Sequence, residues 1–245
     1  MPTVVLALIM ATFTGVMIVG PSLAMNGFLY NPLFFGFVTG LVIGDVRSGF
    51  SIGATCMLMS LGFYTYGGAT IPDYNVGAIY GTILAARGTD LDSALVVATA
   101  LALLMSLFDI LGRATTTVFQ HGGDRALARR DVKAFERWHL MGVIPWFLGR
   151  FIPTFIGIMF IDQVEKINTL MAQYDWVRKG LSVIGKSLPA VGFALLLSYM
   201  DIKSYWPFML LGYALFAYMG VPTLGLAIVG LAAAALFATK NKKEA

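Results

Sequence analysis

Long apolar segments alternate with short polar interruptions along this chain of 245 residues. The first segment runs from Thr3 to Ala24, and a shorter one follows from Leu33 to Gly44. An uncharged run between Arg47 and Asp73 is long enough to cross a bilayer, because about 20 apolar residues match the hydrocarbon core. Its repeated glycines and its Gly-Gly-Ala-Thr-Ile-Pro-Asp ending predict a helix that stops partway instead. Broken helices mark the substrate site in transporters, so the pattern favours a permease.

The second half of the chain predicts further helices around one polar stretch. A long helix is expected from Ser93 to Phe119, and a polar loop from Asp124 to Arg137. Four apolar segments come after this loop: Trp138–Ile161, Leu181–Met200, Ser204–Met219 and Val221–Thr239. Asp162 to Lys179 has apolar residues at helical spacing, which predicts an interfacial amphipathic helix that ends at Gly180.

Composition supports a membrane protein. Hydrophobic residues make up 58% of the chain and charged residues 12%, with a mean hydropathy of +0.79. A soluble domain has about 25% charged residues. We therefore expect an all-α, polytopic integral membrane protein with broken or re-entrant helices and roughly six to eight crossings. Residues 1–239 are predicted to form one membrane domain, and residues 240–245 a basic tail.

The net charge of +4 indicates membrane topology rather than nucleic-acid binding. Basic residues flank apolar segments and are not interleaved with aromatic residues on an exposed face. The positive-inside rule places the Asp124–Arg137 loop and the tail after Thr239 in the cytoplasm. Cys56 is the single cysteine and the two histidines are far apart, so neither an internal disulfide, a metal site nor a cofactor is expected.

Glycines recur at four-residue spacing on both sides of the first charged turn. They are Gly36, Gly40, Gly44, Gly49 and Gly53. Small residues at this spacing allow helices to approach closely in lipid, although glycine is also common in membrane helices generally. Five glycines in two aligned rows favour close packing of two helices.

Several of these residues carry a family resemblance. The sequence Leu41-Val42-Ile43-Gly44-Asp45, followed by Gly49, Ile52-Gly53-Ala54-Thr55, Gly67-Gly68-Ala69 and Pro72-Asp73, resembles the IIC permease subunit of the mannose/fructose/sorbose class of the bacterial sugar phosphotransferase system. The resemblance continues through Phe119-Gln120-His121 and Pro189–Leu196, in the same order. It therefore covers most of the chain.

The resemblance implies a sugar-translocating subunit of the bacterial inner (plasma) membrane. Such a subunit pairs with a second membrane subunit, IID, and the pairs assemble into larger complexes, expected to be trimers of IIC–IID pairs. IIB phosphorylates the sugar on the cytoplasmic side with phosphate received through IIA. IIC itself has no phosphorylated residue. The expected partners are therefore IID, IIB, IIA, the sugar and membrane lipid, and no nucleic acid.

Asp73 is the first candidate for sugar binding. Its carboxylate can accept hydrogen bonds from sugar hydroxyls, or it can cap the helix that begins at Tyr74, and both roles are compatible. The other candidates are Asn26, Thr55, Tyr64, Thr65, Gly67, Gly68 and Tyr74. The polar ones among them also suit helix–helix hydrogen bonds, and the tyrosines suit a membrane interface.

The chain departs from many relatives at two positions, and the departure at Met57 has a consequence for specificity. Many hexose-transporting relatives have a glutamate or another polar residue where this chain has Met57, and often an asparagine where it has Thr65. A site that leaves a polar group unpaired rejects the wrong ligand strongly. The loss of a carboxylate at Met57 therefore argues against plain mannose or glucose specificity.

Two other charged features have simpler interpretations. Asp109 and Arg113 stand four residues apart with the acid first, which suits an ion pair on one helix face. Because they lie near the end of the expected helix, we interpret them as a structural interface pair. His121 has no second histidine nearby and is expected to have a structural role.

Two other classes of function are alternatives for a membrane protein of this kind. The first is a substrate-binding membrane subunit driven by a separate ATPase, such as a vitamin importer. The second is a membrane enzyme that acts on lipid, which would need acids or histidines clustered at one membrane face. The family resemblance and the Pro72-Asp73 break favour the sugar permease over both.

Overall fold

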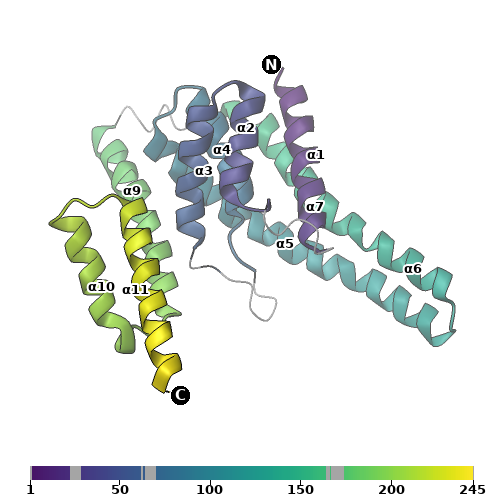
Figure 1. Ribbon diagram of the computed structural model, residues 1–245. Helices are drawn as coiled ribbons and strands as arrows, with labels where there is room; N and C mark the ends of the chain where they lie inside the picture. Colours follow the sequence, from purple (N-terminus) through teal and green to yellow (C-terminus); the bar gives the residue numbers. More distant parts are fainter. Residues whose placement is uncertain are drawn as a thin grey trace. The chain divides into compact units, whose positions relative to one another are not determined.

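The computed structural model of the chain describes residues 2–22, 29–61, 63, 70–163, 166 and 174–244. Within these ranges the chain is helical and contains no strand, which confirms the all-α prediction (Figure 1). The helices are α1 (Thr3–Ser22), α2 (Pro32–Ile43), α3 (Val46–Ser60), α4 (Tyr74–Ala86), α5 (Leu91–Ala128), α6 (Val132–Met141), α7 (Val143–Met159), α9 (Asp175–Ser198), α10 (Ile202–Ala217) and α11 (Thr223–Glu244).

The chain forms two compact units, Met1–Leu196 and Leu197–Ala245. The first unit contains α1 to α7 and nearly all of α9, and the second contains α10 and α11, which contact each other. Lysines of the predicted basic tail belong to the last turns of α11. The predicted boundary at residue 239 is the one between the membrane domain and a cytoplasmic tail. The division into two compact units does not test it, so this boundary stays a prediction.

Glycines join α2 and α3 into a close pair, as the sequence predicted. A Cβ added at Gly36 would lie 2.4 Å from the carbonyl oxygen of Gly49, and one added at Gly53 would lie 2.9 Å from that of Pro32. Any larger side chain there would meet backbone. Gly44 has a different structural role. It ends α2 with a left-handed φ of 92°, which glycine adopts without strain.

The helices α2, α3 and α4 are short and lie side by side (Figure 1). The longest of them, α3, has 15 residues and a length of about 22 Å, well below the hydrocarbon thickness of roughly 30 Å. The uncharged run after Arg47 thus contains a helix that stops at Ser60, as predicted. Contacts with α2, α3 and α5 surround α4, and every residue from Tyr74 to Leu84 is buried.

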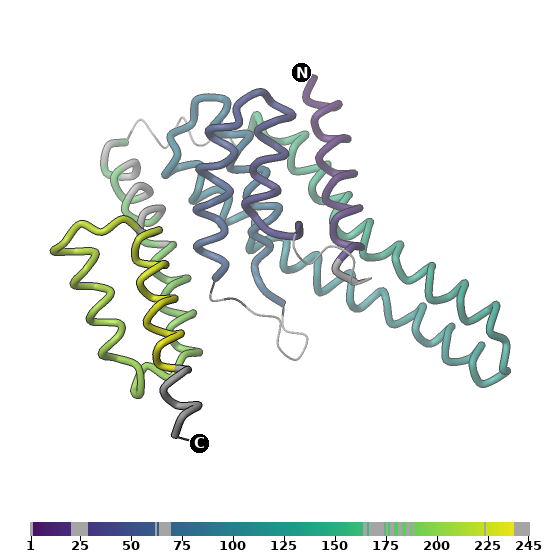
Figure 2. Tube along the Cα trace, in the orientation of Figure 1, coloured from purple at the N-terminus to yellow at the C-terminus, as the bar shows by residue number. Residues whose placement is uncertain are grey.

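The prediction of a polar loop from Asp124 to Arg137 is wrong. The helix α5 continues to Ala128 and α6 begins at Val132, so the two form an antiparallel helical hairpin (Figure 2). Arginine, lysine, glutamate and alanine are good helix formers, and these residues populate both arms. The two helices pack closely because Gly122 leaves room for the indole ring of Trp138. A Cβ added at Gly122 would lie 2.4 Å from this ring.

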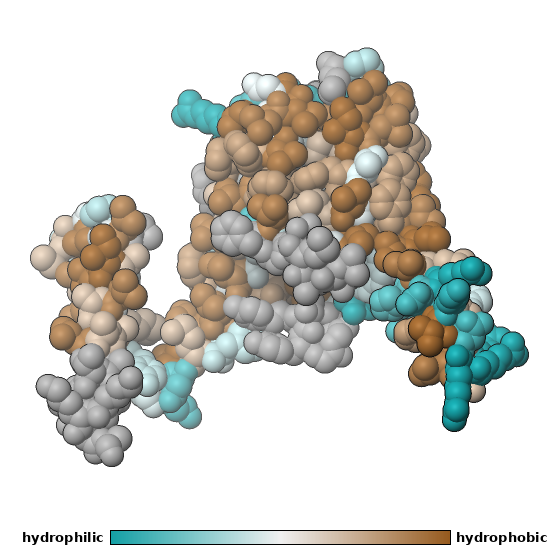
Figure 3. Space-filling view, turned by 45° about the vertical axis from the view of Figure 1, so that its right-hand side comes forward, coloured by the Kyte–Doolittle hydropathy of each residue, from teal (hydrophilic) through white to brown (hydrophobic). Residues whose placement is uncertain are grey.

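The same hairpin contains the longest helix. With 38 residues, α5 is about 57 Å long and exceeds the roughly 30 Å of a hydrocarbon core by a wide margin. A sharp turn at its end places Arg130 at a φ of 56°, and Asp131 then caps α6 by accepting a hydrogen bond from the backbone N–H of Ala134 at 3.0 Å. Figure 3 shows hydrophilic side chains gathered at the end of this hairpin, beyond a broad hydrophobic surface.

The helix end predicted at Gly180 is also wrong. The helix α9 runs from Asp175 through Gly180 to Ser198 without interruption. Glycine permits a left-handed helix end but does not impose one, and a continued helix satisfies the backbone hydrogen bonds within the segment. Half of the predicted amphipathic helix, Asp162 to Lys179, lies outside the described residues. Further along α9, a Cβ at Gly192 would lie 2.4 Å from the carbonyl oxygen of Leu58, so this part packs directly on the end of α3.

Among the described residues, three helical stretches are long and apolar enough to cross a membrane. They are Thr3–Gly20, Leu91–Ala128 and Val132–Met159. Shorter apolar helices are Pro32–Ile43, Pro189–Ser198 and Leu224–Phe237. The total of roughly six to eight crossings stays a prediction, because several of the helices are too short to cross alone.

Candidate functional site

Asp73 organises the start of α4. Its Oδ1 accepts hydrogen bonds from the backbone N–H groups of Asn75 at 3.2 Å and Val76 at 3.3 Å, and its own backbone N–H donates to the carbonyl of Ala102 in α5 at 3.0 Å. The prediction that Asp73 caps this helix is therefore confirmed. A carboxylate at a helix N-terminus satisfies free N–H groups and faces the positive end of the helix dipole.

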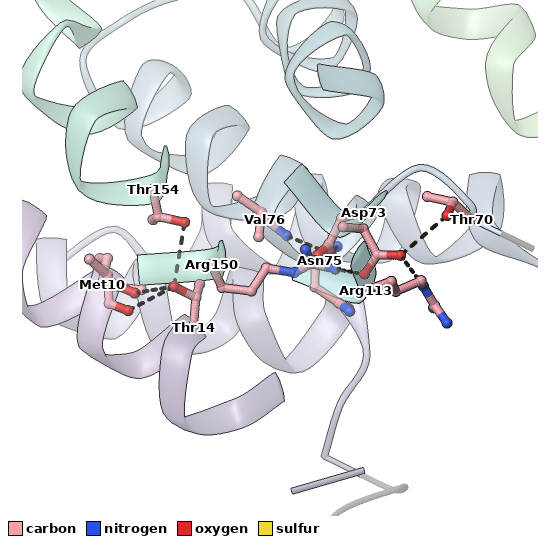
Figure 4. Close-up of polar contacts among 11 residues, drawn as sticks. Met10, Thr14, Thr70, Asp73, Asn75, Val76, Arg113, Arg150 and Thr154 are labelled. Carbon is pink, nitrogen blue, oxygen red and sulfur yellow. Dashed lines mark hydrogen bonds and ion pairs between the residues drawn. The ribbon is translucent and has the colours of Figure 1, made fainter. Parts of the chain in front are cut away.

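Arg150 connects this helix start to α5 and α7. From α7, its Nε lies 2.8 Å from Oδ2 of Asp73, and its Nη2 donates a hydrogen bond of 2.9 Å to Oδ1 of Asp109. Only 7% of Arg150 is exposed. Figure 4 shows its side chain reaching from α7 toward Asp73 and Asn75. A buried arginine is stable only when paired, and here two carboxylates from different segments share it.

Asp109 is the second carboxylate of the cluster. Its Oδ2 accepts hydrogen bonds from Nε of Arg113 at 2.8 Å and from the hydroxyl of Thr70 at 3.3 Å. The predicted Asp109–Arg113 pair on one helix face is thus confirmed. Its expected place near a helix end is wrong, because α5 continues to Ala128 and Asp109 lies midway along it. The guanidinium of Arg113 also lies 5.3 Å from the ring centre of Trp146, a cation–π distance.

These charged residues border a cavity of about 140 Å³. Its lining residues are Ile18, Tyr30, Ile71, Pro72, Asp73, Asn75, Asp109, Arg113, Trp146 and Arg150. Two carboxylates and two guanidinium groups balance each other. Three buried atoms of these lining residues have no aligned hydrogen-bond partner: Oδ2 of Asp73, Oδ1 of Asn75 and Nε of Arg150. The contact between Asp73 and Arg150 is therefore an ion pair without hydrogen-bond alignment, and the cavity offers unused polar capacity.

A second polar row holds α7 in place next to the cavity. The hydroxyl of Thr14 in α1 lies 3.4 Å from that of Thr154, one turn beyond Arg150 (Figure 4). The hydroxyl of Tyr80 in α4 donates to the carbonyl of Pro153 at 3.1 Å. All three side chains are buried. The position of Arg150 is thus set by contacts of α7 with both α1 and α4.

The predicted candidates divide into three groups. Asp73 lies at the cavity, while Asn26, Tyr64, Thr65, Gly67 and Gly68 lie outside the described residues. Thr55 donates its hydroxyl hydrogen bond to the carbonyl of Ser51 in its own helix. Tyr74 is buried in the hydrophobic core against the ring of Phe63 at 5.8 Å. Neither Thr55 nor Tyr74 lines the cavity, and their sugar contacts stay predictions.

Sequence reasoning missed Arg150, the residue at the centre of the cluster. The apolar pattern of the segment Trp138–Ile161 predicts a membrane crossing and gives no role to the one buried charge near its middle. An ionisable residue within a membrane segment is a functional candidate by default, so that rule alone identifies it. Tyr30, Asn75 and Trp146 gave no comparable signal, because uncharged polar and aromatic residues are common in membrane helices.

Fold and site together define a subunit of a multi-pass membrane transporter: a charge-balanced polar cavity lies among α1, the start of α4, α5 and α7. The chain belongs to the family described as the sorbose-specific IIC component of the phosphotransferase system, whose model matches residues 3–236. The predicted family is therefore confirmed, together with its membrane location and its role as a transporter component rather than a catalytic subunit.

Individual relatives agree with this assignment. A sorbose-specific EIIC component from Lacticaseibacillus casei is 30% identical, over 88% of this chain and 78% of its own length. The fructose permease IIC component of Bacillus subtilis is 29% identical over 98% of this chain and 88% of its own. The mannose-specific EIIC component of Escherichia coli is 27% identical over 87% of this chain and 81% of its own. None of these is a vitamin importer subunit, so that alternative is not favoured.

Solved structures show the same architecture. One, described only as a membrane protein, matches with a TM-score of 0.82 and 26% identity over 97% of this chain and 95% of the other. A chain of the mannose transporter ManYZ in complex with microcin E492 matches with a TM-score of 0.59 and 26% identity over 97% of this chain and 94% of the other.

Proposed function

We propose that this chain moves a sugar inward across the bacterial plasma membrane, as the IIC subunit of a mannose-class phosphotransferase complex, for phosphorylation by a IIB subunit. The single observation that carries the proposal is the polar cavity at the start of α4. A carboxylate there needs partners or water at membrane depth, where an isolated one costs roughly 3 kcal/mol on insertion scales. Here it has an arginine partner and still offers an unused acceptor to a hydroxyl.

The expected partners follow from the family. A IID subunit forms the membrane complex with this chain, as trimers of IIC–IID pairs, and IIB and IIA deliver the phosphate from the cytoplasm. This chain carries no phosphorylated residue of its own. The charged end of the α5–α6 hairpin lies on the cytoplasmic side, because its basic residues outnumber its acids and α5 is longer than the hydrocarbon core is thick.

Sugar contact is assigned first to Asp73. The segment Gly67–Asp73, with Thr65 and Tyr64 before it, lines the sugar path, and Asn26, Thr55 and Tyr74 are further candidates. The sequence leaves the sugar open among those of the relatives, and Met57 distinguishes this chain from many hexose transporters.

The test is phosphoenolpyruvate-dependent uptake in cells that express this chain with its IID, IIB and IIA. Labelled mannose, fructose, sorbose and N-acetylgalactosamine are compared, and the best substrate is used for kinetics. Asp73→Asn keeps the shape and one acceptor but removes the charge. We expect its KM to rise about tenfold or more, because a hydrogen bond to a charged group is worth about 1.5–3 kcal/mol.

Asp90→Asn is the matched control. Asp90 also caps a helix, by accepting a hydrogen bond from the backbone N–H of Ser93, but it lies away from the cavity. Asparagine caps nearly as well as aspartate, so its KM should match wild type. The companion variant Met57→Glu should change sugar preference without restoring uptake to Asp73→Asn. Wild-type kinetics in Asp73→Asn, with unchanged preference in Met57→Glu, would move the sugar site away from this segment.

A further inference from the structure

The Asp73 carboxylate is held from two sides, and its orientation depends on a residue distant in sequence. One oxygen, Oδ1, is committed to the backbone N–H groups that begin α4. The other, Oδ2, faces Nε of Arg150 at 2.8 Å. The two contacts together determine the rotation of the carboxylate about its bond to the Cβ atom. The cap alone would leave Oδ2 without a partner next to the cavity.

Arg150 neutralises the charge of Asp73 and leaves Oδ2 of Asp73 free to accept hydrogen bonds. The contact at 2.8 Å lacks hydrogen-bond alignment, so Oδ2 retains acceptor sites beside the cavity. Oδ1 of Asn75 also lacks a hydrogen-bond partner, while the same side-chain amide contacts the hydroxyl of Tyr30, and this residue is only 8% exposed. Two buried acceptors border the same 140 Å³ space. Such a pair suits neighbouring hydroxyl groups, which are the donors that a sugar offers.

Arg150 is itself oriented by a second carboxylate. Its Nη2 donates to Oδ1 of Asp109, whose Oδ2 accepts from Arg113 and Thr70. The planar guanidinium presents separate nitrogens at fixed angles, so it reaches both carboxylates at once. A lysine ammonium has the same charge but a single nitrogen on a flexible stem, and it cannot reproduce this geometry.

We propose that Arg150 is a positioning residue for sugar binding, which holds Oδ2 of Asp73 toward the cavity while Asp109 holds Arg150. This proposal rests on the proposed function, because it assigns Arg150 a role that acts through Asp73. It does not require Arg150 to touch the sugar. The binding energy that it controls is that of the Asp73 carboxylate.

The test uses Arg150→Lys in the same uptake assay, with all four subunits present and with the best substrate of the four-sugar panel. The charge is kept, so the amount of assembled IIC–IID complex should stay near wild type. We expect the KM to rise about tenfold, the effect of one misplaced charged hydrogen-bond partner. The maximal rate at saturating sugar should change by less than about twofold, because Asp73 acts in binding.

Arg87→Lys is the matched control. Arg87 also pairs with an aspartate, Asp162, but it does so at the opposite end of α4. The KM of this variant should equal that of wild type. If Arg150 is purely structural, Arg150→Lys will lower the amount of complex and leave the KM unchanged, which overturns the proposal. If Arg150→Lys does not assemble, Asp109→Asn supplies the same test, because it loosens Arg150 and leaves Asp73 intact.

A double variant separates this proposal from the one on which it rests. If Arg150 acts through Asp73, adding Arg150→Lys to Asp73→Asn should raise the KM by less than about twofold beyond the single variant, since coupled residues are not additive. Fully additive effects would show that Arg150 acts independently and would overturn the positioning role alone. A wild-type KM in Asp73→Asn would instead overturn sugar binding at Asp73, and the positioning role with it.

Discussion

Charged residues cluster in two regions of the first unit, and they are buried in one region and exposed in the other. At the start of α4, the carboxylates of Asp73 and Asp109 are buried and share Arg150. At the end of the α5–α6 hairpin, most charged side chains are exposed. Both regions contain aspartate and arginine side chains. Burial, not residue type, therefore distinguishes the candidate site from a charged surface.

The difference has an energetic consequence. Removing one partner of a buried ion pair leaves an uncompensated charge and costs about 3–5 kcal/mol. An exposed ion pair contributes about 0–1 kcal/mol, because water solvates each charge separately and salt screens them. The same substitution should therefore have very different effects in the two regions, which makes the comparison directly testable.

The largest effect is expected for Arg150→Met. Methionine leaves Asp73 and Asp109 buried without the cation that they share, so the unfolding free energy should fall by about 3–5 kcal/mol. Thermal unfolding of the purified IIC–IID complex in detergent measures this. A melting temperature equal to that of wild type would mean that the two carboxylates find other partners, and would remove the energetic distinction between the two regions.

A smaller effect is expected for Gly49→Ala in the short helices beside the site. The added Cβ would lie 2.4 Å from the carbonyl oxygen of Gly36, and backbone must move to accept it. Overpacking of this kind costs about 1–3 kcal/mol. Gly123→Ala in the hairpin is the control, because its Cβ would meet Phe135 at an ordinary 3.5 Å. It should be neutral or stabilise by up to about 1 kcal/mol, through helix propensity. Equal melting temperatures for both variants would contradict the close packing of α2 on α3.

The smallest effect is expected for Arg137→Gln, on an exposed face of α6. The unfolding free energy should change by less than about 0.5 kcal/mol, as for most surface substitutions. Uptake kinetics should also match wild type at physiological salt. A large loss of stability here would show that the hairpin charges are buried in the assembled complex, and that the two regions are less different than they are in the isolated chain.

Sequence reasoning recovered the features that depend on neighbours along the chain. It found the stop of α3 before the break, the glycine contacts of α2 with α3, the cap at Asp73 and the spacing of Asp109 with Arg113. It failed where several local signals compete. Charged residues between 124 and 137 suggested a loop, but their helix propensity and the room left by Gly122 for Trp138 favoured a hairpin. Gly180 permits a helix end but does not require one, and α9 continues through it.

The sequence by itself determined that this chain is a helical membrane protein, because hydrophobicity and short-range glycine spacing depend only on which residues follow one another. The order of its motifs also identified the IIC family. The shared arginine was decided only by tertiary structure. Arg150 stands 41 residues from Asp109 and further still from Asp73, on a different helix from either. No local spacing brings Arg150 to either carboxylate. They meet because α7 packs against both α1 and α5, and because at membrane depth a buried charge must find its opposite within the protein.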